Sequence, residues 1–122
     1  MAPRFAPKEP VVLDPPKEEV FTFTELAQYN GVEHPSIYVA VKGIVFDVTK
    51  KAEVYGPGKS YSVFAGKDGS RGLAKSSLKL EDAVPQIDGL TDSELVVLDD
   101  WFSYFSQRYN VMGTIADSMA KI

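Results

Sequence analysis

The sequence contains no cysteine and only one histidine, His34. Without cysteine, the chain forms neither disulfides nor cysteine-ligated metal sites such as zinc–thiolate centres and iron–sulfur clusters. It also lacks long hydrophobic runs: stretches such as "IYVAV" and "LVVL" are much shorter than the roughly 20 residues of a membrane helix. The N-terminus shows no charged-then-apolar signal pattern. We therefore expect a soluble chain with no membrane span.

Positive charge is scarce as well. The chain has 13 Lys and Arg residues against 17 Asp and Glu residues, for a net charge of -4, and contains no run of basic residues. Nucleic-acid binding requires a basic electrostatic field, so nucleic acid is excluded as a partner. The apolar fraction of 44% and the charged fraction of 25% are typical of a soluble globular protein, and 122 residues suit one domain.

Proline is concentrated at one end of the chain. The first 20 residues hold five of the eight prolines, and proline removes backbone donors and favours extended conformations. We therefore expect residues 1–20 to form an arm, residues 21–116 to form the folded domain, and residues 117–122 to form a short tail.

The first half of this domain has the pattern of a small sheet. A short strand precedes a helical turn over residues 24–29, with Thr24 as its N-cap and Asn30-Gly31 as its end. The stretch "IYVAVKGIVFDVT" predicts two strands joined by a tight hairpin at Lys42-Gly43. Their side chains should alternate between the two faces of the sheet.

The second half is predicted to be mainly helical. From Ser60 to Ser77, a helical pattern is interrupted by three glycines, which favours two short helices that wall a pocket. A longer helix begins at Thr91, where Thr91 and Glu94 match a capping box, and its apolar residues follow helical spacing. "VMGTI" predicts a last strand.

The segment "GPGKS", residues 56–60, invites comparison with a phosphate-binding loop. A Walker loop needs a glycine five positions before its Gly-Lys-Ser, but that position holds Glu53, whose carboxylate would repel phosphate. The dinucleotide-binding pattern fails too, because Tyr61 stands where a glycine is required. What remains is a glycine-rich turn bracketed by two tyrosines, Tyr55 and Tyr61.

Two groups of motifs carry a family resemblance. "FTFTELAQYNG", "IYVAVKGIVFDVT" and the glycine-proline turn after them resemble the cytochrome b5 fold. "YGPGKSYSVFAGKDGSRGLA" resembles the signature of the membrane-associated progesterone receptor family, the haem-binding branch of the b5-like domains. The similarity runs from Phe21 to about Ile115 and includes "DDWFSYFSQRYNVMGTI". It implies an α+β, cytochrome b5-like fold, in which a small mixed sheet and short helices wall a haem pocket.

The resemblance also implies a set of haem-binding residues. It identifies Tyr61 as the axial iron ligand, Tyr55 as a pocket residue, and Arg108-Tyr109 as the counterpart of the family's lysine-tyrosine pair at the haem edge. Arginine at position 108 keeps the positive charge but changes its reach and donor geometry. A phenolate is a hard oxygen donor that suits ferric iron, and the metal displaces a proton whose ordinary pKa is near 10. From residue type alone, core packing remains an alternative for Tyr61 and Tyr109, and Trp101 is predicted to be a core residue.

Further residues are predicted to lie around this pocket. Cationic candidates for the haem propionates are Lys59, Arg71 and Arg108, and a solvated side chain is the alternative for Lys59. Three glycines, at positions 56, 58 and 66, would let the backbone approach the macrocycle. His34 is predicted to be a surface-loop residue and not the ligand, because it precedes the hairpin, whereas the b5 histidine comes after it.

The resulting functional hypothesis is a non-enzymatic haem-binding protein. Family resemblance implies that it regulates haem-thiolate mono-oxygenases (cytochrome P-450 type) of sterol synthesis at the cytoplasmic side of the endoplasmic reticulum. It also implies haem-mediated homodimers and a sterol as a further ligand. Two alternatives stay open: a b5-type electron carrier, which phenolate ligation disfavours because it stabilises ferric iron, and a haem-free interaction or steroid-binding module. Asp99 and Asp100 are adjacent on a helix and point apart, so they form no catalytic dyad.

Overall fold

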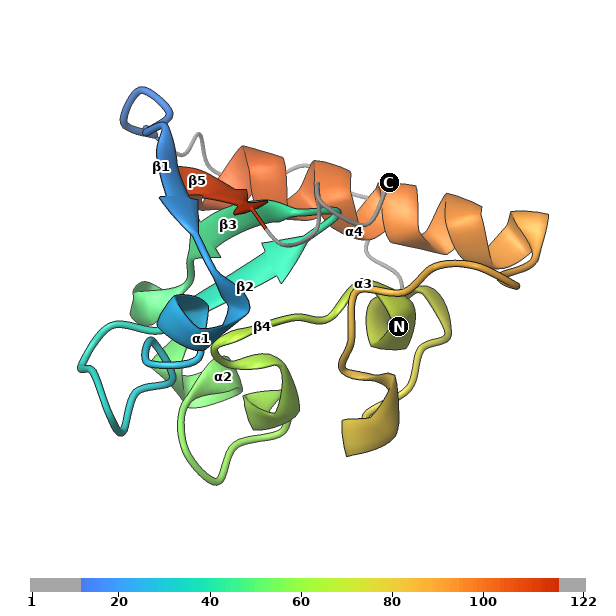
Figure 1. Ribbon diagram of the computed structural model, residues 1–122, viewed down its shortest axis with the longest axis horizontal. Coiled ribbons are helices and arrows are strands. Elements are labelled where there is room, and N and C mark those ends of the chain that lie inside the picture. The colour runs from blue at the N-terminus through green and yellow to red at the C-terminus, as the bar shows by residue number, and fades with distance from the viewer. Residues whose placement is uncertain (1–11, 117–122) are drawn as a thin grey trace.

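A computed structural model describes residues 12–116, which fold around one mixed five-stranded sheet (Figure 1). The strands lie in the order β1-β5-β3-β2-β4. β1 is parallel to β5 and β2 is parallel to β4, whereas β3 is antiparallel to both of its neighbours. The strands are β1 (Glu19–Phe21), β2 (Tyr38–Val41), β3 (Ile44–Asp47), β4 (Lys67–Asp68) and β5 (Asn110–Ile115). The predicted α+β, b5-like sheet is confirmed, while residues 1–11 of the predicted arm and residues 117–122 of the predicted tail lie outside the described residues.

The predicted hairpin between β2 and β3 is present. Lys42 and Gly43 have φ angles of 54° and 79°, and two consecutive positive φ values define the hairpin turn whose twist matches that of the strands. The side chains of β2 alternate as expected: Val39 and Val41 join one buried cluster, and the tyrosine and alanine beside them join the other. Both faces of this central strand are therefore covered.

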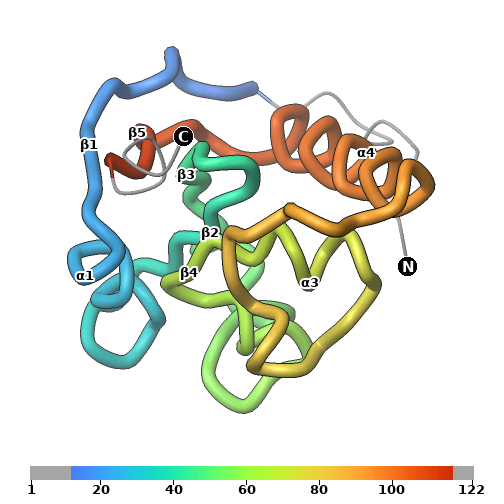
Figure 2. Tube along the Cα trace, turned by 45° about the vertical axis from the view of Figure 1, so that its right-hand side comes forward, coloured from blue at the N-terminus to red at the C-terminus, as the bar shows by residue number. Residues whose placement is uncertain are grey.

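Helices cover the two faces unequally. In Figure 2, the short α1 lies on one side of the strands and the long α4 on the other. The larger buried cluster includes Leu98, Trp101 and Phe105 of α4, so this helix closes the main core. The helices are α1 (Phe23–Leu26), α2 (Ala52–Tyr55), α3 (Ser70–Ala74) and α4 (Asp92–Arg108), with 3-10 turns η1 (Thr49–Lys51), η2 (Ser62–Phe64) and η3 (Leu80–Asp82).

Capping boxes set the start of two helices. The box predicted at the start of α4 is confirmed, with Thr91 as N-cap and Glu94 as its partner. The prediction of Thr24 as the N-cap of the first helix is wrong, because Thr22 caps α1 and exchanges two hydrogen bonds with Glu25. Thr22 has a glutamate three residues later and Thr24 does not, so the reciprocal pair forms only from Thr22.

The segment predicted as two adjoining helices contains a strand between them. Gly66 and Gly69 donate their backbone N–H groups to carbonyl oxygens of β2, which holds β4 in the sheet between η2 and α3. A Cβ at Gly69 would lie 2.4 Å from the ring of Phe64. These glycines thus allow close packing. Gly66 lies against the backbone of Ala27 and is not part of a pocket.

Asp68 ties β4 to the hairpin. Its buried carboxylate accepts hydrogen bonds from the backbone N–H groups of Gly43 and Ser70, each at 3.0 Å, and from the Ser70 hydroxyl. The Ser70 hydroxyl in turn accepts a bond from the backbone of Lys42. Burial raises the pKa of the Asp68 carboxyl, against the lowering effect of these bonds. The polar centre of "AGKDGSRGLA" therefore has a structural role in this fold.

β5 contains an irregularity in its pairing with β3. Val45 of β3 pairs with Gly113, but Phe46 pairs with Val111, so Met112 is an extra residue in β5. The ladder then continues to the pair Asp47 and Asn110. This is the pattern of a β-bulge, which puts two residues opposite one.

A tyrosine-lined cavity as the candidate functional site

The glycine-proline segment forms a tight turn that brings two tyrosines together. Lys59 donates its backbone N–H to the carbonyl of Gly56 at 3.0 Å, and Gly58 has a φ of 76°. Proline at the second position and a positive φ at a third-position glycine are the pattern of a type II turn. The Tyr61 ring then meets the Tyr55 ring edge to face, with centroids 5.9 Å apart.

A cavity of about 280 Å³ lies beside this pair. Two segments line it: residues 51–61, from η1 through the turn, and residues 101–109 of α4 and its C-cap. The lining residues are Lys51, Val54, Tyr55, Tyr61, Trp101, Tyr104 and Tyr109. Three of the four predicted site residues, Tyr55, Tyr61 and Tyr109, are thus brought together.

The phenols of Tyr55 and Tyr109 are buried and coupled. Tyr55 is 2% exposed and Tyr109 is 7% exposed. Burial, reinforced by neighbouring phenols, raises the pKa of Tyr55 well above its ordinary value, and burial raises the pKa of Tyr109 to about 12. A side-chain hydrogen bond between them favours neutral Tyr55 and stabilises the phenolate of Tyr109. These two phenols therefore stay protonated at neutral pH, whereas Tyr61 is only half-buried.

Trp101 and Tyr104 complete the aromatic wall. Trp101 is buried as predicted, yet it also faces the cavity, and its indole Nε1 has no hydrogen-bond partner among the described residues. Trp101 and Tyr104 are three residues apart, so they lie on the same face of α4. This spacing is the sequence signal from which Tyr104 could have been predicted as a lining residue. Sequence reasoning missed Tyr104, Val54 and Lys51, the last because nothing in the sequence says which of several lysines turns toward the site.

Arg108, the fourth predicted site residue, lies behind the cavity wall. It does not line the cavity; its guanidinium lies over the Tyr104 ring, 4.2 Å from the ring centroid. Its Nε is buried without a hydrogen-bond partner among the described residues. Arg108 therefore reaches the site through the ring of Tyr104.

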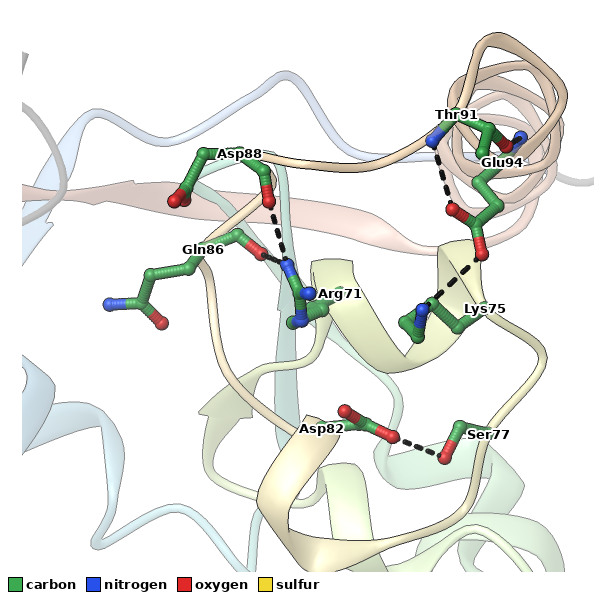
Figure 3. Close-up of polar contacts among 8 residues, drawn as sticks. All are labelled: Arg71, Lys75, Ser77, Asp82, Gln86, Asp88, Thr91 and Glu94. Atoms are coloured by element: carbon green, nitrogen blue, oxygen red, sulfur yellow. Dashed lines mark hydrogen bonds and ion pairs between the residues drawn. The ribbon is translucent and has the colours of Figure 1, made fainter.

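Arg71, a predicted partner for the propionates, is used elsewhere. Its guanidinium donates to the backbone carbonyls of Gln86 and Asp88, at 3.3 and 3.0 Å, and fastens the loop that leads to α4 (Figure 3). Lys75 makes a similar link by pairing with Glu94 at 3.4 Å (Figure 3). Arg71 is not among the residues that line the cavity, and its pairing with a propionate stays a prediction. Lys59 is exposed and lies outside the cavity lining.

His34 lies in the loop between α1 and β2, as predicted. Its ring packs on Tyr29 with centroids 4.4 Å apart, and its Nδ1 accepts a bond from the backbone of Ser36. Tyr29 belongs to the smaller cluster, on the other side of the sheet from the cavity. His34 is thus absent from the cavity lining.

The residues of the cavity fit a planar aromatic group with an oxygen-ligated metal. Within residues 12–116, no group of three His, Cys, Asp or Glu side chains is arranged to hold a metal. Tyr61 offers a phenol, an attested ligand of haem iron, and the other rings offer aromatic walls. The volume is slightly below the range of about 300–1,000 Å³ typical of pockets that enclose a ligand. A group as large as haem would be only partly enclosed.

Comparisons with known proteins agree with this fold and show the family. Residues 22–114 match the family described as "Cytochrome b5-like Heme/Steroid binding domain". The chain is 50% identical to "Probable steroid-binding protein 3" of Arabidopsis thaliana over 96 residues, 78% of this chain and 96% of that protein. It is 38% identical to "Cytochrome P450 regulator dap1" of Schizosaccharomyces pombe over 117 residues, 89% of this chain and 66% of that protein. A solved Arabidopsis thaliana structure described as having a cytochrome b5 like fold matches with a TM-score of 0.74 and 49% identity, over 80% of this chain and 91% of that one.

The relatives differ in how much of them this chain spans. It covers nearly all of the Arabidopsis steroid-binding protein, but 46% of the human "Membrane-associated progesterone receptor component 2", to which it is 38% identical over 81% of its own length. Within residues 12–116, no helix has both the length and the hydrophobicity needed to cross a membrane.

Proposed function

Because the chain belongs to the cytochrome b5-like haem/steroid-binding family, in its branch of membrane-associated progesterone receptor and steroid-binding proteins, we propose that it is a haem-binding protein in which Tyr61 ligates the iron. The observation that carries this proposal is the position of the Tyr61 phenol at the edge of a cavity whose other walls are mainly aromatic. Haem supplies a Lewis-acidic iron to that phenol.

Each cavity residue has a part in this proposal. Tyr61, which follows the glycine-proline turn, lines the cavity, is only half-buried, and is the residue proposed to ligate the iron. Burial raises the pKa values of Tyr55 and Tyr109, so loss of their protons is harder than for an exposed phenol. They act as neutral, hydrogen-bonding walls of the cavity. Trp101 adds a buried aromatic side chain to the wall.

The proposed biological role is regulatory and not catalytic. The Schizosaccharomyces pombe relative is named a cytochrome P450 regulator, which supports an action of this chain on haem-thiolate mono-oxygenases of sterol synthesis. In that role the chain binds and stabilises the mono-oxygenase and performs no reaction of its own. Family resemblance supports a position at the cytoplasmic side of the endoplasmic reticulum. The names of two plant relatives, both called membrane steroid-binding proteins, agree with a position at a membrane.

The deciding experiment is a haem titration of the full chain with absorption spectroscopy. We expect saturable binding with the spectrum of ferric haem held by one phenolate, and a spectrum identical to that of free haem would contradict the proposal. Binding to a purified sterol-synthesising mono-oxygenase, measured with and without haem, then tests the regulatory role. Equal lack of binding in both forms would refute that part alone.

A neutral steroid is the second candidate ligand. The mainly apolar lining of the cavity favours it, because six of the seven described lining residues are aromatic or aliphatic. The name of the Arabidopsis relative agrees with this choice. Competition separates the two: a steroid that occupies this cavity must displace haem from it.

A further inference from the structure

The cavity has one charged side chain in its lining. Among the described residues that form its walls, only Lys51 is ionic, and the other six are aromatic or aliphatic. A lone cation beside apolar walls is suited to an amphiphilic ligand that carries an acidic group at one end. This feature distinguishes the two candidate ligands, because haem carries two propionates and a sterol carries none.

The backbone fixes where Lys51 emerges. Lys51 is the last residue of η1, its N–H donates to the carbonyl of Val48 at 2.8 Å, and it directly precedes α2. α2 in turn carries Tyr55 into the cavity. Lys51 therefore joins the cavity lining from the same short segment that places a tyrosine in the wall.

The side chain of Lys51 is available to a ligand. Its Nζ lies 3.8 Å from a carboxylate oxygen of Glu53, and the two side chains are 49% and 66% exposed. A long ion pair between exposed side chains contributes little, so a second carboxylate can compete for the ammonium at small cost.

Other cations nearby are less suited to this role. Lys50 and Lys59 are exposed and outside the lining. Arg71 donates to backbone carbonyls of the loop before α4, and the guanidinium of Arg108 lies over the ring of Tyr104. Lys51 thus differs from each of them by lining the cavity itself.

We propose that Lys51 is the carboxylate anchor of this cavity and makes it selective for an acidic porphyrin over a neutral ligand, with Glu53 as a competing carboxylate that the ligand displaces. This inference rests on the proposed haem-binding function. The flexible lysine stem lets the ammonium leave Glu53 and pair with a propionate in a charge-assisted hydrogen bond. Removal of the Lys51 charge then weakens the binding of acidic ligands only. Removal of the Glu53 charge strengthens the binding of the same ligands.

The test compares haem with haem dimethyl ester, in which both propionates are neutral. Each is titrated into wild type, Lys51→Gln, Glu53→Gln and the matched control Lys50→Gln, which loses the same charge from the neighbouring exposed position. We expect Lys51→Gln to weaken haem binding roughly two- to fivefold, the effect of a pair of exposed charges, and to leave ester binding unchanged. Glu53→Gln should tighten haem binding about twofold, and Lys50→Gln should change neither ligand. Salt at about 0.5 M should shrink the Lys51 effect by screening.

Three other outcomes would each refute the anchor, for different reasons. Equal losses in Lys51→Gln and Lys50→Gln would mean that only net charge matters, and the anchor would be refuted. Equal losses for haem and its ester in Lys51→Gln would mean that the variant damages the cavity, which also refutes the anchor. If wild type binds neither porphyrin, the proposed function fails and the anchor fails with it. Circular dichroism confirms that each variant is folded.

Discussion

The backbone N–H of Tyr61 donates to the carbonyl of Val54 at 2.9 Å. This bond closes the tyrosine turn, residues 54–61, so that the chain returns to α2 six residues after Tyr55 has left it. The turn therefore presents two phenols to one cavity from a single short segment. The other wall of the cavity is formed by α4 and its C-cap residue.

Tyr61→Phe should abolish most haem binding and leave the fold intact. The phenylalanine ring keeps the contacts with Tyr55, Phe64 and Trp101, but no oxygen remains for the iron. Haem titration and circular dichroism measure the two effects. The control is His34→Ala, which removes the one histidine from the far side of the sheet and should bind haem normally. Loss of haem in the histidine variant with retention in the tyrosine variant would reverse the ligand assignment.

Arg108→Ala should weaken haem binding by about 1–2 kcal/mol, a typical contribution of a guanidinium stacked on an aromatic ring. The expected cause is greater freedom of Tyr104, whose ring Arg108 covers. Arg108→Lys keeps the charge without the planar stacking surface and should recover only part of the loss. A dissociation constant that is unchanged in both variants at low salt would remove Arg108 from the site.

Haem should promote dimerisation. The cavity is small for haem, so part of the macrocycle would stay uncovered, and a large apolar patch favours burial against a second copy through a two-fold contact. Sedimentation of apo and haem-loaded protein at matched concentrations measures this. The same monomer mass in both forms over a wide concentration range would contradict haem-mediated assembly and leave haem binding untouched.

Alkaline pH should destabilise the protein through its buried phenols. Unfolded tyrosines lose their protons near pH 10, whereas burial raises the pKa of Tyr109 to about 12 and that of Tyr55 in the same direction. Between these values, the unfolded chain has released protons that the folded chain still holds. The stability that these phenols contribute is therefore full below about pH 10 and falls as pH rises toward 12. Denaturant unfolding at about pH 9 and about pH 11 should show this loss, and a smaller one in Tyr109→Phe.

Gly113→Ala should destabilise the fold by at least about 2 kcal/mol, through strain and overpacking. Gly113 has a φ of 155°, and a Cβ there would lie 2.0 Å from the carbonyl oxygen of Glu19 in the parallel strand β1. Gly89→Ala is the control, because its φ of 81° is also positive but nothing lies within 4 Å of the added atom. Chemical denaturation compares the two, and equal losses would show that backbone strain alone matters.

Local patterns predicted much of this fold. The Lys42-Gly43 turn and the Thr91–Glu94 box depend on residues close in sequence, and both are confirmed. β4 escaped prediction because two residues give no periodicity, and their strand is defined only by the parallel partner β2. Thr22 was missed because Thr24 is an equally good N-cap by residue type. Only the position of Glu25, three residues after Thr22, distinguishes the two threonines.

The site was predictable in its aromatic half only. Tyr55, Tyr61 and Tyr109 came from a motif, whereas Lys51 and Tyr104 join the cavity through the packing of α2 against the end of α4. Arg71 shows the opposite case: its residue type suited an anionic ligand, but its donors are bound to the loop before α4. Which cation reaches a cavity depends on tertiary packing, and sequence spacing carries no information about it.

The extra residue Met112 has a consequence for how this domain tolerates changes in chain length. Side chains of a strand alternate with period two, so one residue more or fewer exchanges the faces of everything beyond it. Deletion of Met112 would leave Val111 and Gly113 consecutive, opposite Phe46 and Val45 in a regular ladder, and would keep Asn110 opposite Asp47. The two lining segments are joined through the pair Asp47 and Asn110, one on each strand. A change of one residue at the bulge is therefore taken up beside Met112, and the pairing next to Tyr109 keeps that wall of the cavity in place.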